Sequence, residues 1–409
     1  MPEETSIAAP RPASWVWLLA LFTAAGFIET VFWGQMSAFT PLYLPHFGIP
    51  PQAVPQWTGY IASLSILVGI PFLPLWGALA DRYSRQPIIV RSFVAHLIAG
   101  VVAMLAGNVW VFILGRAVMS FALGNSGLMM TTLAERTPRA RIGLAFTIMN
   151  SASPIGAFIG PLLGGPVVDR WGFPTLLLIN AGLMAVVILA LTLGYRDTYK
   201  GVNRGPLLSM AVDSVRIIAR SPRLRALFPA LFVMNSGWML AFTYIPLATT
   251  ALYRGDAPAT AVGLVMGGGG LVTLFLGPMV GALADRAGHW RTLFAGAALS
   301  VLLWPLPMFA PSLLVFGALW AVINGLASAV FALSFTVLSD STTSDSRGRV
   351  MSFSYLPVNL GIMAGPAIGS LVTRTNIFYV FPAAALITLL SLGALFIAFR
   401  QPVAAGTPS

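Results

Sequence analysis

Long runs of apolar residues dominate the chain, and short polar segments separate them. Each run comes close to or exceeds the roughly 20 residues that an α-helix needs to cross a bilayer. Because lipid cannot satisfy free backbone N–H and C=O groups, continuous runs of this length predict helices. The pattern predicts membrane spans at residues 15–41, 57–80, 87–107, 109–133, 143–168, 173–195, 224–252, 260–284, 290–310, 312–338, 349–373 and 376–399.

Composition supports a membrane protein and excludes an ordinary soluble one. Of the 409 residues, 57% are hydrophobic and 9% are charged, whereas a soluble domain carries about 25% charged residues. The chain has no cysteine, so it forms no disulfide. The first 14 residues are acidic and rich in Pro and Ala, and the first apolar run is too long for a signal peptide, so we expect no cleavable signal.

The positive charges predict the orientation. With the N-terminus in the cytoplasm, most of the 23 Lys and Arg residues fall at cytoplasmic helix ends or loops. Arg170, Arg254 and Arg374 fall outside, and Arg116 falls within a span. Cytoplasmic loops are enriched in Lys and Arg, so we expect a multi-pass protein of the inner (cytoplasmic) membrane with both termini inside. The net charge of +11 then reflects topology and not nucleic-acid binding.

An internal repeat divides the chain into two halves. Gly77-Ala78-Leu79-Ala80-Asp81-Arg82 recurs 204 residues later as Gly281-Ala282-Leu283-Ala284-Asp285-Arg286. Glu135 likewise matches Asp340 at an offset of 205 residues. Repeats of this kind predict two parallel six-span bundles. We place the bundles at residues 1–195 and 224–409, joined by a cytoplasmic linker at residues 196–223.

The linker contains one segment with helical periodicity. Apolar residues recur with helical spacing between Leu207 and Ile218, and Arg216 and Arg220 lie among and beyond them. This pattern predicts a short amphipathic helix at the cytoplasmic surface, and a plain flexible linker is the alternative.

A second motif, in span 5, also recurs. Gly156-x-x-x-Gly160-Pro161-x-x-Gly164-Gly165 matches Gly361-x-x-x-Gly365-Pro366-x-x-Gly369-Ser370 in span 11. Small residues at four-residue spacing let helices approach closely, and proline within a helix removes a backbone donor and can kink it. The repeat symmetry places span 11 across the interface between the halves, so we expect a seam that can form and part. Ordinary helix packing is the alternative.

These motifs resemble those of the major facilitator superfamily, over essentially the whole chain. Gly77–Arg82 resembles its signature loop, although Ser84 and Gln86 depart from the usual ending. The Gly-Pro motif of span 5 is similar to the antiporter motif of its 12-span drug:proton exporters. Arg116 resembles its conserved membrane arginine, followed here by Met119 and Ser120 where Gln-Gly is common. The resemblance implies an all-α fold of two rocking six-helix bundles that acts as a transporter.

Charges near the signature loops form a candidate conformational switch. A carboxylate near a helix N-terminus gains about 0.3–1 kcal/mol from the helix dipole. The resemblance implies that Asp81 meets the start of span 11, where it would hold the outward-open state, and that Arg82 bridges to Glu135. The alternative is that these are solvated loop charges. The candidate switch residues are Gly77, Asp81, Arg82, Glu135, Gly281, Asp285 and Arg286.

Glu29 is the only acid deep in a predicted span, and Arg116 is the only base. Intramembrane charges are costly and mark function. At about 1.5 Å per residue, Glu29 lies roughly 21 Å above the inner start of span 1, and Arg116 lies roughly 11 Å below the outer start of span 4. We therefore expect the two side chains at similar height, as neighbours or facing one cavity. Pairing and burial shift a carboxyl pKa in opposite directions, so Glu29 is a candidate proton carrier. A static buried ion pair is the alternative.

The predicted cavity is aromatic and sparsely polar. Aromatic rings and one carboxylate suit a lipophilic cation. The candidate lining residues are Trp33, Asn150, Trp238, Tyr244, Trp320, Asn324, Tyr355 and Asn359. His96 in span 3 could titrate, although a lone histidine is more often a satisfied core residue.

The sequence therefore predicts a monomeric secondary transporter that exports hydrophobic or cationic small molecules against protons. Its expected partners are the substrate, protons and membrane lipid, with no nucleic acid. With three His, no Cys and no metal-ligand or catalytic motif, we expect no enzyme activity, cofactor or metal. Export of a sugar, lipid or amphiphilic metabolite, and a non-transporting membrane sensor, remain alternatives.

Overall fold

The computed structural model describes residues 14–72, 76, 79, 84–197, 216–342 and 344–402. These residues fold into helices joined by short loops, with no strand among them. Within this part of the chain, twelve helical segments are long and apolar enough to cross a membrane. Each overlaps one of the twelve predicted spans, with ends that differ by up to six residues, and the predicted end of span 2 at residue 80 lies outside the described residues. The all-α polytopic fold is therefore confirmed.

The spans are built from the following helices. The described part of the first half contains α1 (Trp15–Tyr43), α2 (Val54–Leu67), α4 (Arg85–Met104), α5 (Val109–Met119), α6 (Asn125–Arg136), α7 (Ile142–Trp171) and α8 (Phe173–Gly194). The second half contains α10 (Pro222–Leu252), α11 (Pro258–Ala287), α12 (His289–Leu303), α13 (Leu313–Asp340), α14 (Ser344–Val372) and α15 (Val380–Arg400).

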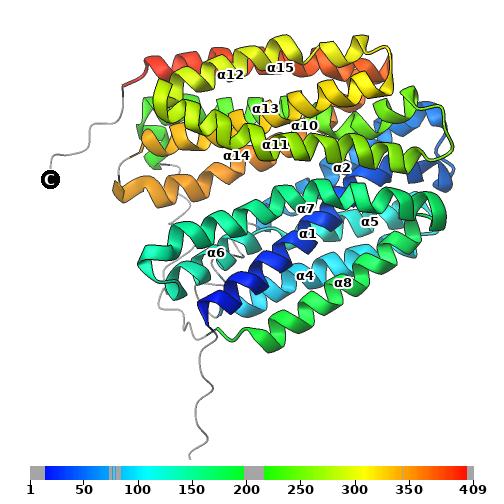
Figure 1. Cartoon of the computed structure of the whole chain (residues 1–409), viewed down its shortest axis with the longest axis horizontal. Helices are drawn as coiled ribbons and strands as arrows, with labels where there is room; N and C mark the ends of the chain where they lie inside the picture. The colour runs from blue at the N-terminus through cyan, green and yellow to red at the C-terminus, as the bar shows by residue number, and fades with distance from the viewer. Residues whose placement is uncertain are drawn as a thin grey trace, which may run out of the picture.

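The helices of each half gather into one bundle, and the two bundles lie side by side (Figure 1). Equivalent helices of the repeat make equivalent contacts. In the first bundle α1 packs along α7, and α4 packs on α8. In the second bundle α10 packs along α14, and α12 packs on α15. The packing inside each half therefore follows the sequence repeat.

Two helix pairs make most of the contacts between the bundles, α7 with α11 and α2 with α14, and α1 and α2 make smaller contacts with α10. We call the end that carries Trp15 and Arg400 the terminal end, and the opposite end the far end. The joining contacts recorded for these pairs lie toward the far end. There the Ser63 hydroxyl of α2 donates a 2.7 Å hydrogen bond to the Met363 carbonyl of α14. A side-chain Cβ at Gly165 would lie 2.6 Å from the carbonyl oxygen of Ala259, so α7 and α11 touch through their backbones.

The buried core shows the same asymmetry between the two ends. One apolar cluster runs through the first bundle and continues into the far half of the second, where it includes Phe242, Val262 and Phe381. The terminal half of the second bundle has a separate cluster, which includes Leu227, Leu293 and Val337. The bundles are therefore sealed together at the far end and have separate cores at the terminal end.

Several predicted features lie outside the described residues. They are Gly77, Asp81 and Arg82 of the first signature loop and most of the predicted linker helix. Within the linker, residues 216–220 are helical.

Candidate functional site

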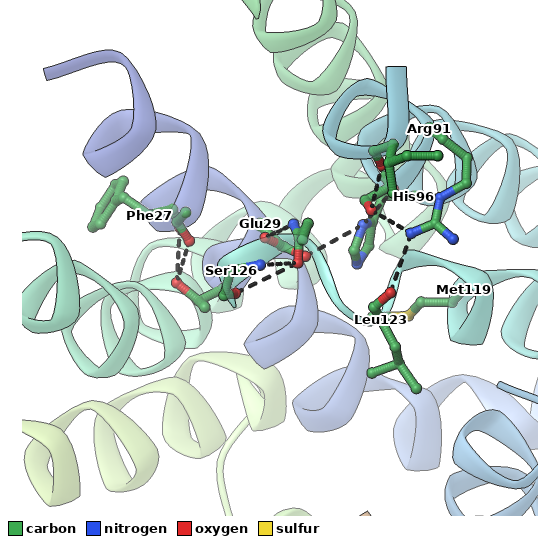
Figure 2. Close-up of polar contacts among 12 residues, drawn as sticks. Phe27, Glu29, Arg91, His96, Met119, Leu123 and Ser126 are labelled. Carbon is green, nitrogen blue, oxygen red and sulfur yellow. Dashed lines mark hydrogen bonds and ion pairs between the residues drawn. The ribbon is translucent and has the colours of Figure 1, made fainter. Parts of the chain in front are cut away.

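Glu29 lies at the middle of α1, fourteen residues from either end of that helix. Its side chain is largely buried inside the first bundle. The Nδ2 amide of Asn125 donates a 2.7 Å hydrogen bond to Glu29 Oε2. The other carboxylate oxygen lies 3.8 Å from Nδ1 of His96 on α4. Figure 2 shows Glu29 between Ser126 on one side and the His96 ring on the other. A carboxyl group at mid-span is thus held by two other spans.

Asn125 reaches Glu29 because span 4 is broken. Helix α5 ends at Met119, a 3-10 turn follows at Ser120–Ala122, and α6 begins at Asn125. Gly124 between them has φ +98°, which glycine adopts without the steric cost that a Cβ imposes. The break directs the N-terminus of α6 toward the carboxylate, where helix dipoles favour negative charge. Discontinuous helices form sites of this kind in transporters.

His96 and Arg91 extend the cluster along α4. Nδ1 of His96 lies 3.0 Å from the Ser92 carbonyl, which fits a ring that donates from this nitrogen. Nη2 of Arg91 donates to the Leu123 carbonyl at 3.1 Å, a group that the break in span 4 leaves free. The guanidinium of Arg91 also lies 3.7 Å from the ring centroid of Trp76. Figure 2 shows Arg91 beyond His96, with Leu123 below it. Glu29 therefore has a neutral amide and an imidazole as direct neighbours, and a guanidinium lies further away.

Arg116 and Glu29 have different direct partners, so the first of the two expected arrangements, direct neighbours, is not found, while a cavity that both side chains face stays a prediction. Arg116 is buried, at 6% exposure, on α5. Its Nε donates a 3.1 Å hydrogen bond to Ser65 Oγ on α2. The residue of span 4 that meets Glu29 is instead Asn125, nine positions further toward the terminal end. Similar height in the membrane does not make Glu29 and Arg116 neighbours, because span 4 breaks at Gly124 and the Arg116 side chain on α5 points toward α2.

The candidate lining residues do not share one surface. Trp33 of α1 stacks on Phe242 of α10 across the bundles, with ring centroids 5.7 Å apart. Trp320 and Asn324 are fully buried inside the second bundle, and Tyr244 is fully buried where that bundle meets Gly59 of α2. The remaining side chains differ in exposure: Trp238 donates to Asn324 at 3.1 Å and is partly buried, Asn359 is buried, Tyr355 is 60% exposed, and Asn150 is exposed.

The glycine rows pack inside each bundle, which corrects the expected seam between spans 5 and 11. A Cβ at Gly156 or Gly160 would strike α1, at the Phe27 and Val31 carbonyl oxygens respectively. Gly164 faces Gln35 and Phe39 of the same helix. The equivalent contacts of Gly361 and Gly365 are with α10, and the Pro366 carbonyl accepts a hydrogen bond from Tyr244. On α7, Pro161 and Gly165 instead contact α11. The row thus fixes α1 on α7, and the adjacent face of α7 meets the other bundle.

A well-formed ion pair lies at the terminal end of the first bundle. The two terminal guanidinium nitrogens of Arg85, Nη1 and Nη2, donate to the Glu135 carboxylate at 2.7 and 2.8 Å. Asp197 accepts from the backbone N–H of Arg85 at 2.6 Å, at the start of α4. Burial raises the pKa of the adjacent Tyr195 phenol to about 12, so it stays neutral at physiological pH. The expected partner of Glu135, Arg82, lies outside the described residues.

The second bundle has an equivalent arrangement in which a histidine stands in place of the arginine. His289, the counterpart of Arg85, places Nδ1 2.6 Å from Asp340 and Nε2 3.4 Å from Asp285. Gly281 has open space where a Cβ would stand, and Arg286 is exposed. Asp285 therefore engages a histidine of its own bundle, one helical turn away.

Sequence reasoning missed three residues of the Glu29 cluster. Asn125 is the second residue of the pair Gly124-Asn125, and a glycine inside a helical pattern is a break signal that the surrounding apolar run conceals. Arg91 lies near the cytoplasmic end of predicted span 3, where the enrichment of Lys and Arg accounts for an arginine without any specific partner. His96 was considered more typical of a core histidine, since its approach to Glu29 is a tertiary contact.

The chain matches the family model of the Major Facilitator Superfamily over residues 21–302 and 249–409. It is similar to "Multidrug resistance protein MdtG" of Serratia proteamaculans (strain 568), with 28% identity over 390 residues that cover 93% of this chain and 94% of the relative. The protein of the same name from Klebsiella pneumoniae (strain 342) is 27% identical over 386 residues, covering 93% and 92%.

Solved structures show the same fold. The D-xylose-proton symporter superposes with a TM-score of 0.76 at 14% identity, covering 95% of this chain and 99% of that one. The nucleoside transporter NupG gives a TM-score of 0.73 at 15% identity, covering 94% and 100%. With the family model matched across both halves, the chain belongs to the major facilitator superfamily and is a multi-pass membrane transporter rather than an enzyme.

Proposed function

We propose that this transporter exports hydrophobic or cationic small molecules in exchange for protons, by alternating access of its two bundles. Glu29 is the group that carries the proton, and the terminal end faces the cytoplasm. The observation that carries the proposal is the position of Glu29: a carboxyl group at the middle of a span, held by Asn125 and His96, with no Lys or Arg of the described chain in direct contact.

The surroundings of Glu29 suit reversible protonation. An ionised carboxylate accepts the Asn125 hydrogen bond and benefits from the N-terminus of α6. A protonated carboxyl group avoids the cost of burying a charge. Because these effects oppose each other, a small change in hydration or helix position can favour one form over the other. The break at Gly124 supplies a joint at which such a change can occur.

The contacts between the bundles support alternation. At the far end, the Asp169 carboxylate of α7 accepts hydrogen bonds from the backbone N–H groups of Ala259 and Thr260, at 3.0 and 2.7 Å. These two residues form the N-terminus of α11, in the opposite bundle. Together with the bond from Ser63 to Met363, this contact corresponds to a state that is closed at the far end. Loss of these few polar contacts would let the two bundles separate at the far end.

The substrate class rests on the relatives and on the central aromatic rings. The relatives carry the name multidrug resistance protein. Trp33 and Phe242 stack where the bundles meet, below the far-end seal. Aromatic faces attract organic cations, and the Glu29 carboxylate, which contacts an amide and an imidazole but no Lys or Arg of the described chain, adds charge complementarity.

Ethidium flux in proteoliposomes tests the proposal. The wild-type flux should accelerate when a pH gradient is imposed. Glu29→Gln preserves the size of the side chain and removes its titration, so its flux should be the same with and without the gradient. Asp256→Asn is the matched control, because Asp256 is an exposed acid in the far-end loop, and it should keep the acceleration. Acceleration that persists in Glu29→Gln would refute proton coupling through this residue.

A further inference from the structure

An apolar groove of about 710 Å³ opens between α1 and α7 in the terminal half of the molecule. Its α1 wall includes Val16, Ala20, Ala24 and Phe27, and its α7 wall runs from Thr147 to Ile155. The hydroxyls of Thr147 and Ser151 are bonded to their own helix, to the carbonyls of Gly143 and Thr147. Thr23 is the third hydroxyl residue of the lining, and its buried Oγ1 has no hydrogen-bond partner. The rest of the groove presents hydrocarbon to an occupant, and Ala20, Ala24, Ile148 and Ser151 in its walls are exposed.

The groove continues the interface between the bundles. Ile148 and Ile155 lie on the same helical face as Leu162, which packs against Gly267 of α11. Ser151 is likewise in line with Phe158, which packs against Gly270. In its far half this face of α7 is covered by α11. In its terminal half the same face lines the groove, and no helix of the described chain takes the place of α11 there.

The dimensions of the groove match one lipid leaflet. From Val16 to Phe27 the α1 wall rises roughly 16 Å, at about 1.5 Å per residue. One leaflet of a bilayer core about 30 Å thick spans about 15 Å. An acyl chain that enters at the terminal end would extend along the groove as far as Phe27 and Ile155, near the level of Glu29.

Positive charges lie at the terminal opening of the groove, so they favour a lipid with an anionic headgroup. Arg139 and Arg141 form the turn that precedes α7. The Arg141 guanidinium lies 5.6 Å from the ring centroid of Trp15, at the start of α1. The first amides of α7 emerge at the same place, with no side chain capping them, and helix N-termini favour phosphate. The nearest acid along the chain, Glu135, has both oxygens occupied by Arg85.

We infer that this groove holds one acyl chain of an anionic phospholipid, with the phosphate at Arg141 and the start of α7. The lipid is a bound ligand and not the transported cargo. In this state it occupies the space that α11 occupies in the far half, so it supports the conformation that is open at the terminal end.

The test measures lipid retention and needs no transport, so its result is independent of the proposed proton coupling. The protein is reconstituted in an equimolar mixture of phosphatidylglycerol and phosphatidylcholine, re-extracted in mild detergent and examined by native mass spectrometry. The wild type should retain one phosphatidylglycerol. Ala24→Trp and Ser151→Trp fill the groove from opposite walls, and each should abolish this retention. Leu189→Trp, at an exposed position on α8, should leave it intact.

The headgroup is tested separately. One arginine near an anionic lipid surface contributes about fivefold in affinity, so Arg141→Gln should lower the preference for phosphatidylglycerol about fivefold. Arg170→Gln is the matched control, because Arg170 lies beside Trp171 at the far end, and it should change nothing. Retention that survives both tryptophan variants would overturn the inference. Displacement of the lipid by ethidium would also overturn it, because the groove would then be a cargo site.

Discussion

The Asn125 amide donates a 2.7 Å hydrogen bond to Glu29 across two helices of the first bundle. This contact exists because span 4 breaks at Gly124 and begins again at Asn125. The equivalent span of the second bundle, α13, runs from Leu313 to Asp340 without a break. The two halves therefore share their packing but differ in the place that holds the buried acid.

Removal of this amide should impair exchange. A hydrogen bond to a charged group contributes about 1.5–3 kcal/mol, which corresponds to roughly 10- to 100-fold in rate if the ionised Glu29 must be held in this position. We expect Asn125→Ala to reduce gradient-driven ethidium flux by that range. Gln52→Ala, which changes an exposed amide side chain at the far end, should leave the flux within about twofold. An unchanged flux in Asn125→Ala would mean that the contact has no part in coupling.

Asp169 should control the far-end seal. It accepts two backbone hydrogen bonds from the N-terminus of α11, and each charge-assisted bond contributes about 1.5–3 kcal/mol. We expect Asp169→Ala to raise the population that is open at the far end by at least about tenfold. Because the chain contains no cysteine, spin labels at Trp110→Cys and Leu314→Cys can report the distance between the bundles.

The control for this measurement is Asp256→Asn, which changes an exposed acid at the same end. The distance distribution of this variant should match that of the unmodified background. If Asp169→Ala also matches it, the contact does not stabilise the closed far end.

The Arg85–Glu135 pair should contribute more stability than its counterpart in the repeat. Arg85 is buried while Glu135 is half-exposed, so removal of the carboxylate leaves a largely buried cation with one partner fewer. We expect Glu135→Ala to lower the free energy of unfolding by about 1–3 kcal/mol, between the values for surface and buried pairs. Asp340→Ala removes the exposed counterpart and should cost less than about 1 kcal/mol. Denaturant unfolding in detergent compares the two, and equal losses would contradict the assignment.

Gly160 should tolerate no side chain. A Cβ there would lie 2.6 Å from the Val31 carbonyl oxygen, which forces α1 and α7 apart along their full contact. Gly160→Ala should therefore lower the melting temperature in detergent markedly. Gly182→Ala meets nothing within 4 Å and should be neutral or stabilising, because alanine exceeds glycine in helix propensity by about 1 kcal/mol. Similar melting temperatures for the two variants would show that the contact between α1 and α7 can adjust to the added methyl group.

The sequence by itself determined the twelve spans, the two halves and the isolation of Glu29. The spans and the isolation of Glu29 follow from the cost of placing polar groups in lipid, because this cost fixes where apolar and charged residues stand along the chain. The two halves follow from the repeated motifs. The glycine rows were also visible, because close helix approach requires small residues at fixed spacing.

Only the tertiary structure decided which residues those features meet. It pairs Glu29 with Asn125 and His96 instead of Arg116, and it seats Gly160 on α1 instead of placing it in a seam with span 11. Counting residues along a straight helix gives the height of a side chain in the membrane. It gives neither the direction in which that side chain points nor a break in the helix such as that at Gly124. Partners across helices are fixed by how the packed faces turn toward one another, and this depends on all the helices of the bundle at once.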